Sequence, residues 1–177
     1  MRTLTLLRHA KSAWTDPVPR DFDRPLNSRG QRAAVTVGRH LREAGVTFDH
    51  VVASPAVRVI ETLDHFWQGF GTRLTPHWDR RIYLASSATL LDVLRETPAS
   101  AKCVLMVGHN PGLEDLVFDL VPEGAPLRSS VEEKYPTATV AEMTLPIDDW
   151  ARIEARSGDL TRFTRPRDLD PALGPDD

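Results

Sequence analysis

The sequence predicts one α/β domain in which a mostly parallel sheet is covered by helices on both faces. Apolar runs typical of buried strands alternate along the chain with segments whose apolar residues recur at helical spacing. The 177 residues are enough for one hydrophobic core, and neither a linker nor an internal repeat divides them. We therefore expect a single domain over residues 1–165 and a flexible tail over residues 166–177.

The chain begins with a strand and an irregular segment. Thr and Leu alternate over residues 3–7, which predicts a short strand that ends at Arg8 and His9. Residues 14–27 are rich in Asp and Pro, which interrupt regular structure. We expect a loop there that is able to lie over a site.

A helix and a second strand are predicted next. Ser28 and Gln31 have the spacing of a capping box, so a helix is expected from Ser28 to Gly45, a residue typical of helix ends. The apolar residues that follow predict a buried strand at residues 48–53. This strand is the second whose end leads into a helix.

The helix that follows the strand at 48–53 carries an arginine in its first turn. Ser54 and Pro55 are expected to be the N-cap and the first-turn proline of a helix whose first turn carries Arg58. A further helix at residues 88–96 precedes the strongest strand pattern of the chain, at residues 103–108. The sequence thus predicts repeated strand-to-helix junctions.

A histidine follows the strongest strand directly. His109 is followed by Asn110 and Pro111, which are expected to cap and begin the next helix. The remainder is predicted to hold a loop at residues 122–136 and later strands at 137–145 and 151–155.

Composition narrows the classes of function. Lys and Arg total 22 against 25 Asp and Glu, and a formal net charge of -3 argues against a broad electrostatic surface for nucleic acid. The single cysteine, Cys103, allows no disulfide within the chain and no cysteine-rich zinc site. No apolar run approaches the roughly 20 residues that span a bilayer. We expect a cytoplasmic protein that binds neither nucleic acid nor membrane.

Polar residues gather where the predicted strands end. Carboxyl ends of parallel strands meet at one edge of a sheet, and ligands of such folds bind there. This edge is predicted to hold Arg8, His9, Arg58 and His109. Paired guanidinium groups are bidentate donors for a phosphate dianion, and a neutral imidazole is a nucleophile toward phosphorus, which a second histidine can assist. The four residues therefore predict phosphoryl transfer through a phosphohistidine.

Metal binding is the alternative for paired histidines. A divalent cation beside Arg8 and Arg58 would face like charges, and neither a His-Glu-x-x-His motif nor a cysteine pair completes a metal site. We therefore expect no metal and no other cofactor.

Four segments carry a family resemblance in a consistent order. They read LLRHAKS at 6–12, LNSRG at 26–30, SPAVRVIET at 54–62 and VGHNPG at 107–112. Together they resemble the histidine phosphatase superfamily. The Arg-His-Ala-Lys-Ser and Gly-His-Asn-Pro-Gly motifs, with Tyr-Pro-Thr-Ala at 135–138, look like its small SixA-type phosphohistidine phosphatases. The resemblance implies a three-layer, phosphoglycerate mutase-like fold in which residues 1–165 form the catalytic domain.

The resemblance also implies a role for each of the four residues. His9 takes the phosphoryl group, Arg8 and Arg58 clamp it, and His109 supports its oxygens. The implied reaction is hydrolysis through a phosphohistidine intermediate without a cofactor.

Three further residues are candidates for the site, and each could instead be an ordinary surface residue. Lys11 and Ser12 follow the nucleophile and could bind the substrate, although a solvated lysine fits the sequence equally well. Asp79 could be the acid that protonates an ester leaving group, or a surface partner for Arg80 or Arg81.

The expected substrate is phosphohistidine in a protein. An imidazole leaves more readily than an alkoxide, and a short chain without a large inserted cap suggests a site open to a protein side chain. The alternatives are a phosphatase of small phosphoester metabolites and a non-catalytic phosphate-binding module.

Overall fold

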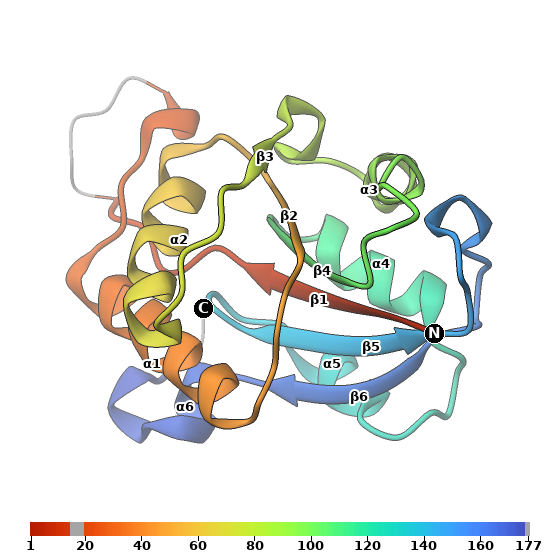
Figure 1. Ribbon diagram of the computed structural model, residues 1–177. Helices are drawn as coiled ribbons and strands as arrows, with labels where there is room; N and C mark the ends of the chain where they lie inside the picture. The colour runs from red at the N-terminus through yellow and green to blue at the C-terminus, as the bar shows by residue number, and fades with distance from the viewer. Residues whose placement is uncertain (15–19, 176–177) are drawn as a thin grey trace.

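The computed structural model describes residues 1–14 and 20–175, and in them a central sheet lies between layers of helices (Figure 1). The strands are β1 (Arg2–Arg8), β2 (His50–Ala53), β3 (His77–Trp78), β4 (Cys103–Gly108), β5 (Val140–Leu145) and β6 (Asp159–Thr164). The helices are α1 (Ser28–Glu43), α2 (Val57–Phe70), α3 (Ser87–Arg95), α4 (Gly112–Leu120), α5 (Arg128–Glu133) and α6 (Pro166–Leu169). Short 3₁₀ helices are η1 (Asp21–Asp23), η2 (Arg80–Ile82), η3 (Trp150–Arg152) and η4 (Pro171–Leu173).

The sheet has the strand order β3-β2-β4-β1-β5-β6 and is mostly parallel. Strands β3, β2, β4 and β1 run parallel to one another, whereas β5 is antiparallel to both β1 and β6. Arg8 is level with Gly108 in the β1–β4 ladder, and the backbone N–H of His9 donates to the Gly108 carbonyl at 3.0 Å. The residues that follow β1 and β4 therefore begin side by side at one edge of the sheet.

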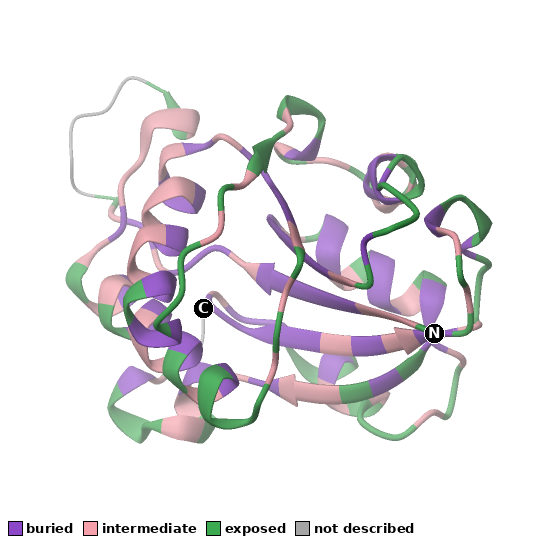
Figure 2. Cartoon of the chain, in the orientation of Figure 1, coloured by how far each residue is buried: buried purple, intermediate pink, exposed green. Residues whose placement is uncertain are grey.

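Alternating side chains of the central strands form a core on each face. On β4, Val104 and Met106 pack with apolar residues of α3, α4 and α5, whereas Leu105 and Val107 pack with α1 and α2. Figure 2 shows the buried class concentrated on the central strands and on the sides of the helices that face them. The predicted three-layer α/β fold with a mostly parallel sheet is confirmed.

Three predicted helix starts differ from the structure. The predicted capping box at Ser28 is wrong, because the side chain of Asn27 accepts from the Gly30 N–H at 2.8 Å and caps α1. Ser54 and Pro55 precede α2, which begins only at Val57. Helix α4 likewise begins at Gly112, with Pro111 as its N-cap residue instead of Asn110.

The C-terminal third differs most from expectation. The strand predicted at 151–155 is wrong, since this segment contains η3 and the last strand is β6. Helix α5 lies within the predicted loop 122–136. Much of the predicted flexible tail is ordered, because α6 and η4 pack on the domain and bury Pro166 and Leu173. Residues 176–177 lie outside the described part, as do Asp16, Pro17 and Pro19 of the predicted loop.

Within the described part of the chain, no helix is both long enough and apolar enough to cross a membrane.

Candidate active site

The four predicted site residues line one cavity of about 320 Å³. Arg8 ends β1 and His9 follows it, Arg58 lies in the first turn of α2, and His109 follows β4. The cavity is lined by Arg8, His9, Lys11, Ser12, Trp14, Asp21, Arg24, Arg58, Leu84, His109, Asn110 and Thr137. The prediction that these strand ends form a common site therefore agrees with the fold.

His9 has its tautomer set by the backbone. Its Nδ1 lies 2.7 Å from the carbonyl oxygen of Ala10, which can only accept, so Nδ1 carries the proton and Nε2 keeps its lone pair. Burial lowers the pKa of His9 well below its ordinary value, and the nearby charges of Arg8 and Arg58 act in the same direction. His9 is therefore a neutral imidazole with a free lone pair at neutral pH.

His109 has the opposite arrangement. Nη2 of Arg58 donates to Nδ1 of His109 at 3.3 Å, so Nε2 carries the proton and donates to the hydroxyl of Ser54 at 2.8 Å. The ring centroids of His9 and His109 lie 5.3 Å apart. Burial, followed by the charge of Arg58, lowers the pKa of His109 to about 3. The ring is thus neutral when no phosphoryl group is bound.

Arg58 is buried and held by the loop that precedes α1. Its Nη1 donates to the Asp21 carbonyl at 2.8 Å, and its Nη2 donates to Asp21 Oδ2 at 2.9 Å. The same carboxylate accepts from the Tyr83 hydroxyl at 2.6 Å and pairs with Nε of Arg24 at 3.2 Å. Burial opposes ionisation of Asp21, but Tyr83 and Arg58 outweigh it, so its pKa is lowered. The cavity therefore contains an ionised carboxylate.

Arg8 is oriented by the chain that leads into β5. Its Nη1 donates to the backbone carbonyl of Tyr135 at 2.9 Å, and Nδ2 of Asn110 donates to the same oxygen at 2.9 Å. Tyr135 is itself buried, and its hydroxyl donates to the Leu6 carbonyl at 2.7 Å. Asn110 Oδ1 also accepts from the N–H of Glu114 at 3.2 Å, so Asn110 supports both α4 and the site.

Helices α1 and α2 fix the backbone that follows His9. The N–H of Ala10 donates to the Thr62 hydroxyl at 2.9 Å, and that hydroxyl donates to the Arg58 carbonyl at 2.6 Å. At the start of α1, a Cβ on Gly30 would lie only 2.2 Å from the carbonyl oxygen of Lys11. Only glycine permits this approach, which accounts for the glycine at the end of the LNSRG segment at 26–30.

The three further candidates have different positions. Lys11 and Ser12 both line the cavity, and the backbone of Ser12 forms a bridge with Leu26. Asp79 does not line it: its carboxylate binds Arg81, with Oδ2 lying 2.7 Å from Nη2. The position of Asp79 matches the alternative of a surface ion-pair partner. Among the described residues, no group of three or more His, Cys, Asp or Glu side chains could hold a metal ion.

Sequence reasoning missed several residues of the site. The sequence places Asp21 only within a loop rich in Asp and Pro, it predicts Ser54 only as a helix cap, and it indicates no role for Tyr83 or Arg24. The available signal was the acidic and basic sequence at residues 21–24 within a loop expected to lie over the site. Nothing in the pattern indicated which charge would meet Arg58.

Comparison with known proteins places the chain in a family. Residues 4–82 match the profile of the histidine phosphatase superfamily (branch 1). An uncharacterized protein from Mycobacterium tuberculosis is 32% identical over 164 residues, which cover 91% of this chain and 100% of that protein. An uncharacterized chloroplastic protein from Arabidopsis thaliana is 28% identical over 166 residues, which cover 89% of this chain and 72% of that protein.

Solved structures give the same assignment. A protein from Nakamurella multipartitia assigned as phosphohistidine phosphatase SixA has a TM-score of 0.82 and 28% identity, covering 93% of this chain and 96% of its own. One from Agrobacterium tumefaciens with the same assignment has a TM-score of 0.78 and 26% identity, covering 93% and 97%. The chain belongs to the histidine phosphatase superfamily and is a SixA-like member of it.

Proposed function

We propose that this protein removes the phosphoryl group from phosphohistidine in a partner protein, by transfer to His9 and hydrolysis of the phosphoenzyme. The coarser part, phosphatase activity, is supported by membership of the superfamily and by the SixA-like neighbours. A cytoplasmic location stays a prediction. The observation that carries the proposal is the neutral His9, whose protonated Nδ1 leaves the Nε2 lone pair available as a nucleophile.

The first step transfers the phosphoryl group to His9. The Nε2 lone pair forms a bond to phosphorus while the bond from phosphorus to the substrate imidazole breaks, and the electron pair leaves with that ring. Arg8 and Arg58 offset the charge on the phosphoryl oxygens. The arriving negative charge favours the protonated form of His109, which then donates to an equatorial oxygen.

The second step regenerates the enzyme. Water attacks phosphorus of phospho-His9, the bond from phosphorus to Nε2 breaks, and the pair returns to His9. The water supplies the new oxygen of inorganic phosphate, and its proton passes to the phosphate product or to solvent. His9 is then again neutral and held by Ala10.

The two carboxylic acids Asp21 and Asp79 favour a nitrogen leaving group, because neither can supply a proton. An alkoxide needs a proton as it leaves, whereas an imidazole protonated on its other nitrogen departs as a neutral ring. Among the described lining residues, Asp21 is the one carboxylic acid, and its lowered pKa keeps it ionised at neutral pH. Asp79 is bound to Arg81, which lowers its pKa as well. Neither is a suitable proton donor at neutral pH.

Phosphorus NMR in one competition mixture tests the proposal. The protein is incubated with two peptides of the same sequence, one carrying phosphohistidine and the other phosphoserine. We expect the phosphoramidate signal to disappear first, while the ester signal persists. Faster loss of the ester would contradict the proposal and direct attention to small phosphoesters.

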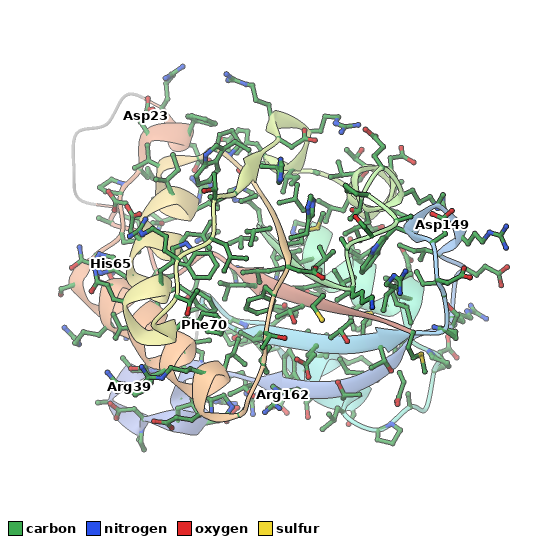
Figure 3. All side chains as sticks on the ribbon, viewed as in Figure 1. Asp23, Arg39, His65, Phe70, Asp149 and Arg162 are labelled. Atoms are coloured by element: carbon green, nitrogen blue, oxygen red, sulfur yellow. The ribbon has the colours of Figure 1, made fainter. Side chains whose placement is uncertain are left out.

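Two variants serve as controls for the competition. His9→Ala should leave both signals at the rate of spontaneous hydrolysis. His65→Ala removes a histidine of α2 (labelled in Figure 3) that does not line the cavity, and this variant should match the parent protein.

A further inference from the structure

A side chain of the protein itself occupies the expected phosphate clamp. Arg58 is only 2% exposed, and its Nη2 already donates to Asp21 Oδ2 and to Nδ1 of His109, at 2.9 and 3.3 Å. These two bonds use both hydrogens of that nitrogen. A phosphoryl oxygen can therefore bond Nη2 only by replacing one of these partners.

Charge identifies Asp21 as the partner to be replaced. A buried guanidinium requires a nearby anion, which Asp21 provides in the absence of a phosphoryl group. A phosphoryl dianion beside the same guanidinium would repel the Asp21 carboxylate. The side chain of Asp21 is 44% exposed, so it can turn toward solvent, and the Arg24 guanidinium remains available to it.

We propose that Asp21 is a specificity-determining residue, whose carboxylate holds Arg58 until a dianionic phosphoryl group displaces it. Another carboxylate gains no more from Arg58 than Asp21 already provides, and it therefore does not displace Asp21. A phosphoryl dianion gains more because of its second charge. The inference rests on the proposed function only in requiring that the site binds a phosphoryl group.

Calorimetric titration with inorganic phosphate measures the competition directly. Asp21→Asn keeps the size of the side chain and an oxygen for Arg58 and Tyr83, but it removes the charge. We expect the Kd for phosphate to fall about tenfold, as for the loss of one competing charge-assisted hydrogen bond. An unchanged or higher Kd would overturn the proposal.

Asp23→Asn is the matched control. Asp23 belongs to the same 3₁₀ helix η1, but it pairs with Arg20 at 2.8 Å and does not line the cavity. Figure 3 shows it at the outer edge of the molecule. This variant removes the same charge from the same element and should leave the Kd for phosphate unchanged; tightening equal to that of Asp21→Asn would overturn the proposal.

A double-mutant cycle tests whether Asp21 acts through Arg58. In an Arg58→Ala background, Asp21→Asn should change the Kd for phosphate by less than about twofold. The same tenfold gain in both backgrounds would mean a general charge effect and would overturn the role assigned to Arg58.

Acetate tests discrimination between anions. It should compete with phosphate in Asp21→Asn and not in the parent protein, whereas equal competition in both would contradict the specificity role. These titrations require no turnover. A preference for esters in the phosphorus NMR experiment would thus refute the proposed substrate but would not affect the role of Asp21. Equally, an unchanged Kd for phosphate in Asp21→Asn would refute the role of Asp21 but would not affect the proposed substrate.

Discussion

The two histidines of the site differ in which ring nitrogen holds a proton, and this assigns their roles. Nδ1 of His9 is bound to a backbone acceptor, so its Nε2 lone pair is available. His109 uses Nδ1 to accept from Arg58 and Nε2 to donate to Ser54, so neither nitrogen offers a lone pair to phosphorus. The neighbours of the rings, more than the residue type, favour His9 over His109 as the proposed nucleophile.

The first prediction concerns His9. His9→Ala should reduce the rate of phosphoryl hydrolysis by at least about 10³-fold, because no other neutral lone pair occupies its place. The fold should persist, since the substitution removes one hydrogen bond, that to Ala10, worth about 1 kcal/mol. Rates and thermal melts on one preparation check both parts. Retained turnover would remove His9 from its role.

The second prediction concerns pH and His109. Its pKa is lowered to about 3 from 6.5, so the unfolded chain takes up a proton first as pH falls. The contribution of the neutral ring to stability is complete above about pH 6.5 and is lost progressively toward pH 3. Urea unfolding from pH 6.5 to 4.5 should show a steeper loss in the parent protein than in His109→Gln, by up to about 1.4 kcal/mol per pH unit. Parallel slopes would contradict the assigned burial.

The sequence allowed the candidate residues of the cavity to be placed together but not their partners to be predicted. Arg8, His9 and His109 stand at strand ends, which the residue pattern and the parallel topology locate together. Asp21 and Tyr83 meet Arg58 through the packing of a loop and a 3₁₀ helix against α2. Such contacts depend on tertiary geometry, for which local periodicity carries no signal.

At the scale of elements, the sequence indicates which residues lie near each helix start, but not the residue at which the helix begins. Ser, Asn and Pro all favour helix starts, so the sequence offers neighbouring alternatives for one boundary. The later starts of α2 and α4 have a consequence for the site. Ser54 and Asn110 lie before these helices, where Ser54 accepts from His109 and Asn110 donates to the Tyr135 carbonyl while each also accepts from a backbone N–H near the helix start.

The C-terminal elements were missed because their signals are weak. Strand β6 has exposed or half-buried residues at most positions, so its apolar alternation is incomplete. Helix α6 and η4 are short, and their order comes from contacts with α1, with Leu173 buried among alanines of the small cluster that includes Ala33 and Ala34. Tertiary packing, more than local propensity, orders these segments.

The third prediction concerns the contact between α1 and α2, the helix that carries Arg58. A Cβ on Gly38 of α1 would lie 2.2 Å from the Phe66 carbonyl oxygen, so the helices can approach only with glycine there. Gly38→Ala should lower the free energy of unfolding by about 2–3 kcal/mol through forced separation. Arg39→Ala, on the exposed side of α1 (Figure 3), should change it by less than about 0.5 kcal/mol. Similar urea midpoints for the two variants would contradict this packing.

At the scale of the whole molecule, the site joins all three layers. Arg8 comes from the sheet, Arg58 from a helix on one face, and His109 from the segment that leads into α4 on the other face. The core clusters that hold α2 and α4 lie on opposite sides of the sheet. A bound anion therefore adds a further contact among parts of the chain from all three layers, which already meet at the hydrogen bond between Arg58 and His109.

The fourth prediction is that phosphate stabilises the entire fold through this connection. A ligand that binds only the native state raises the unfolding free energy by RT ln(1 + [L]/Kd), so phosphate at ten times its Kd should raise the Tm by about 3–6 °C. Arg58→Ala should lose most of this rise, whereas Arg73→Ala, which removes an exposed arginine paired with Asp64, should keep it. Phosphate also stabilises proteins in general by exclusion from their surface. An equal rise in the two variants would assign the effect to that exclusion and remove Arg58 from the anion site.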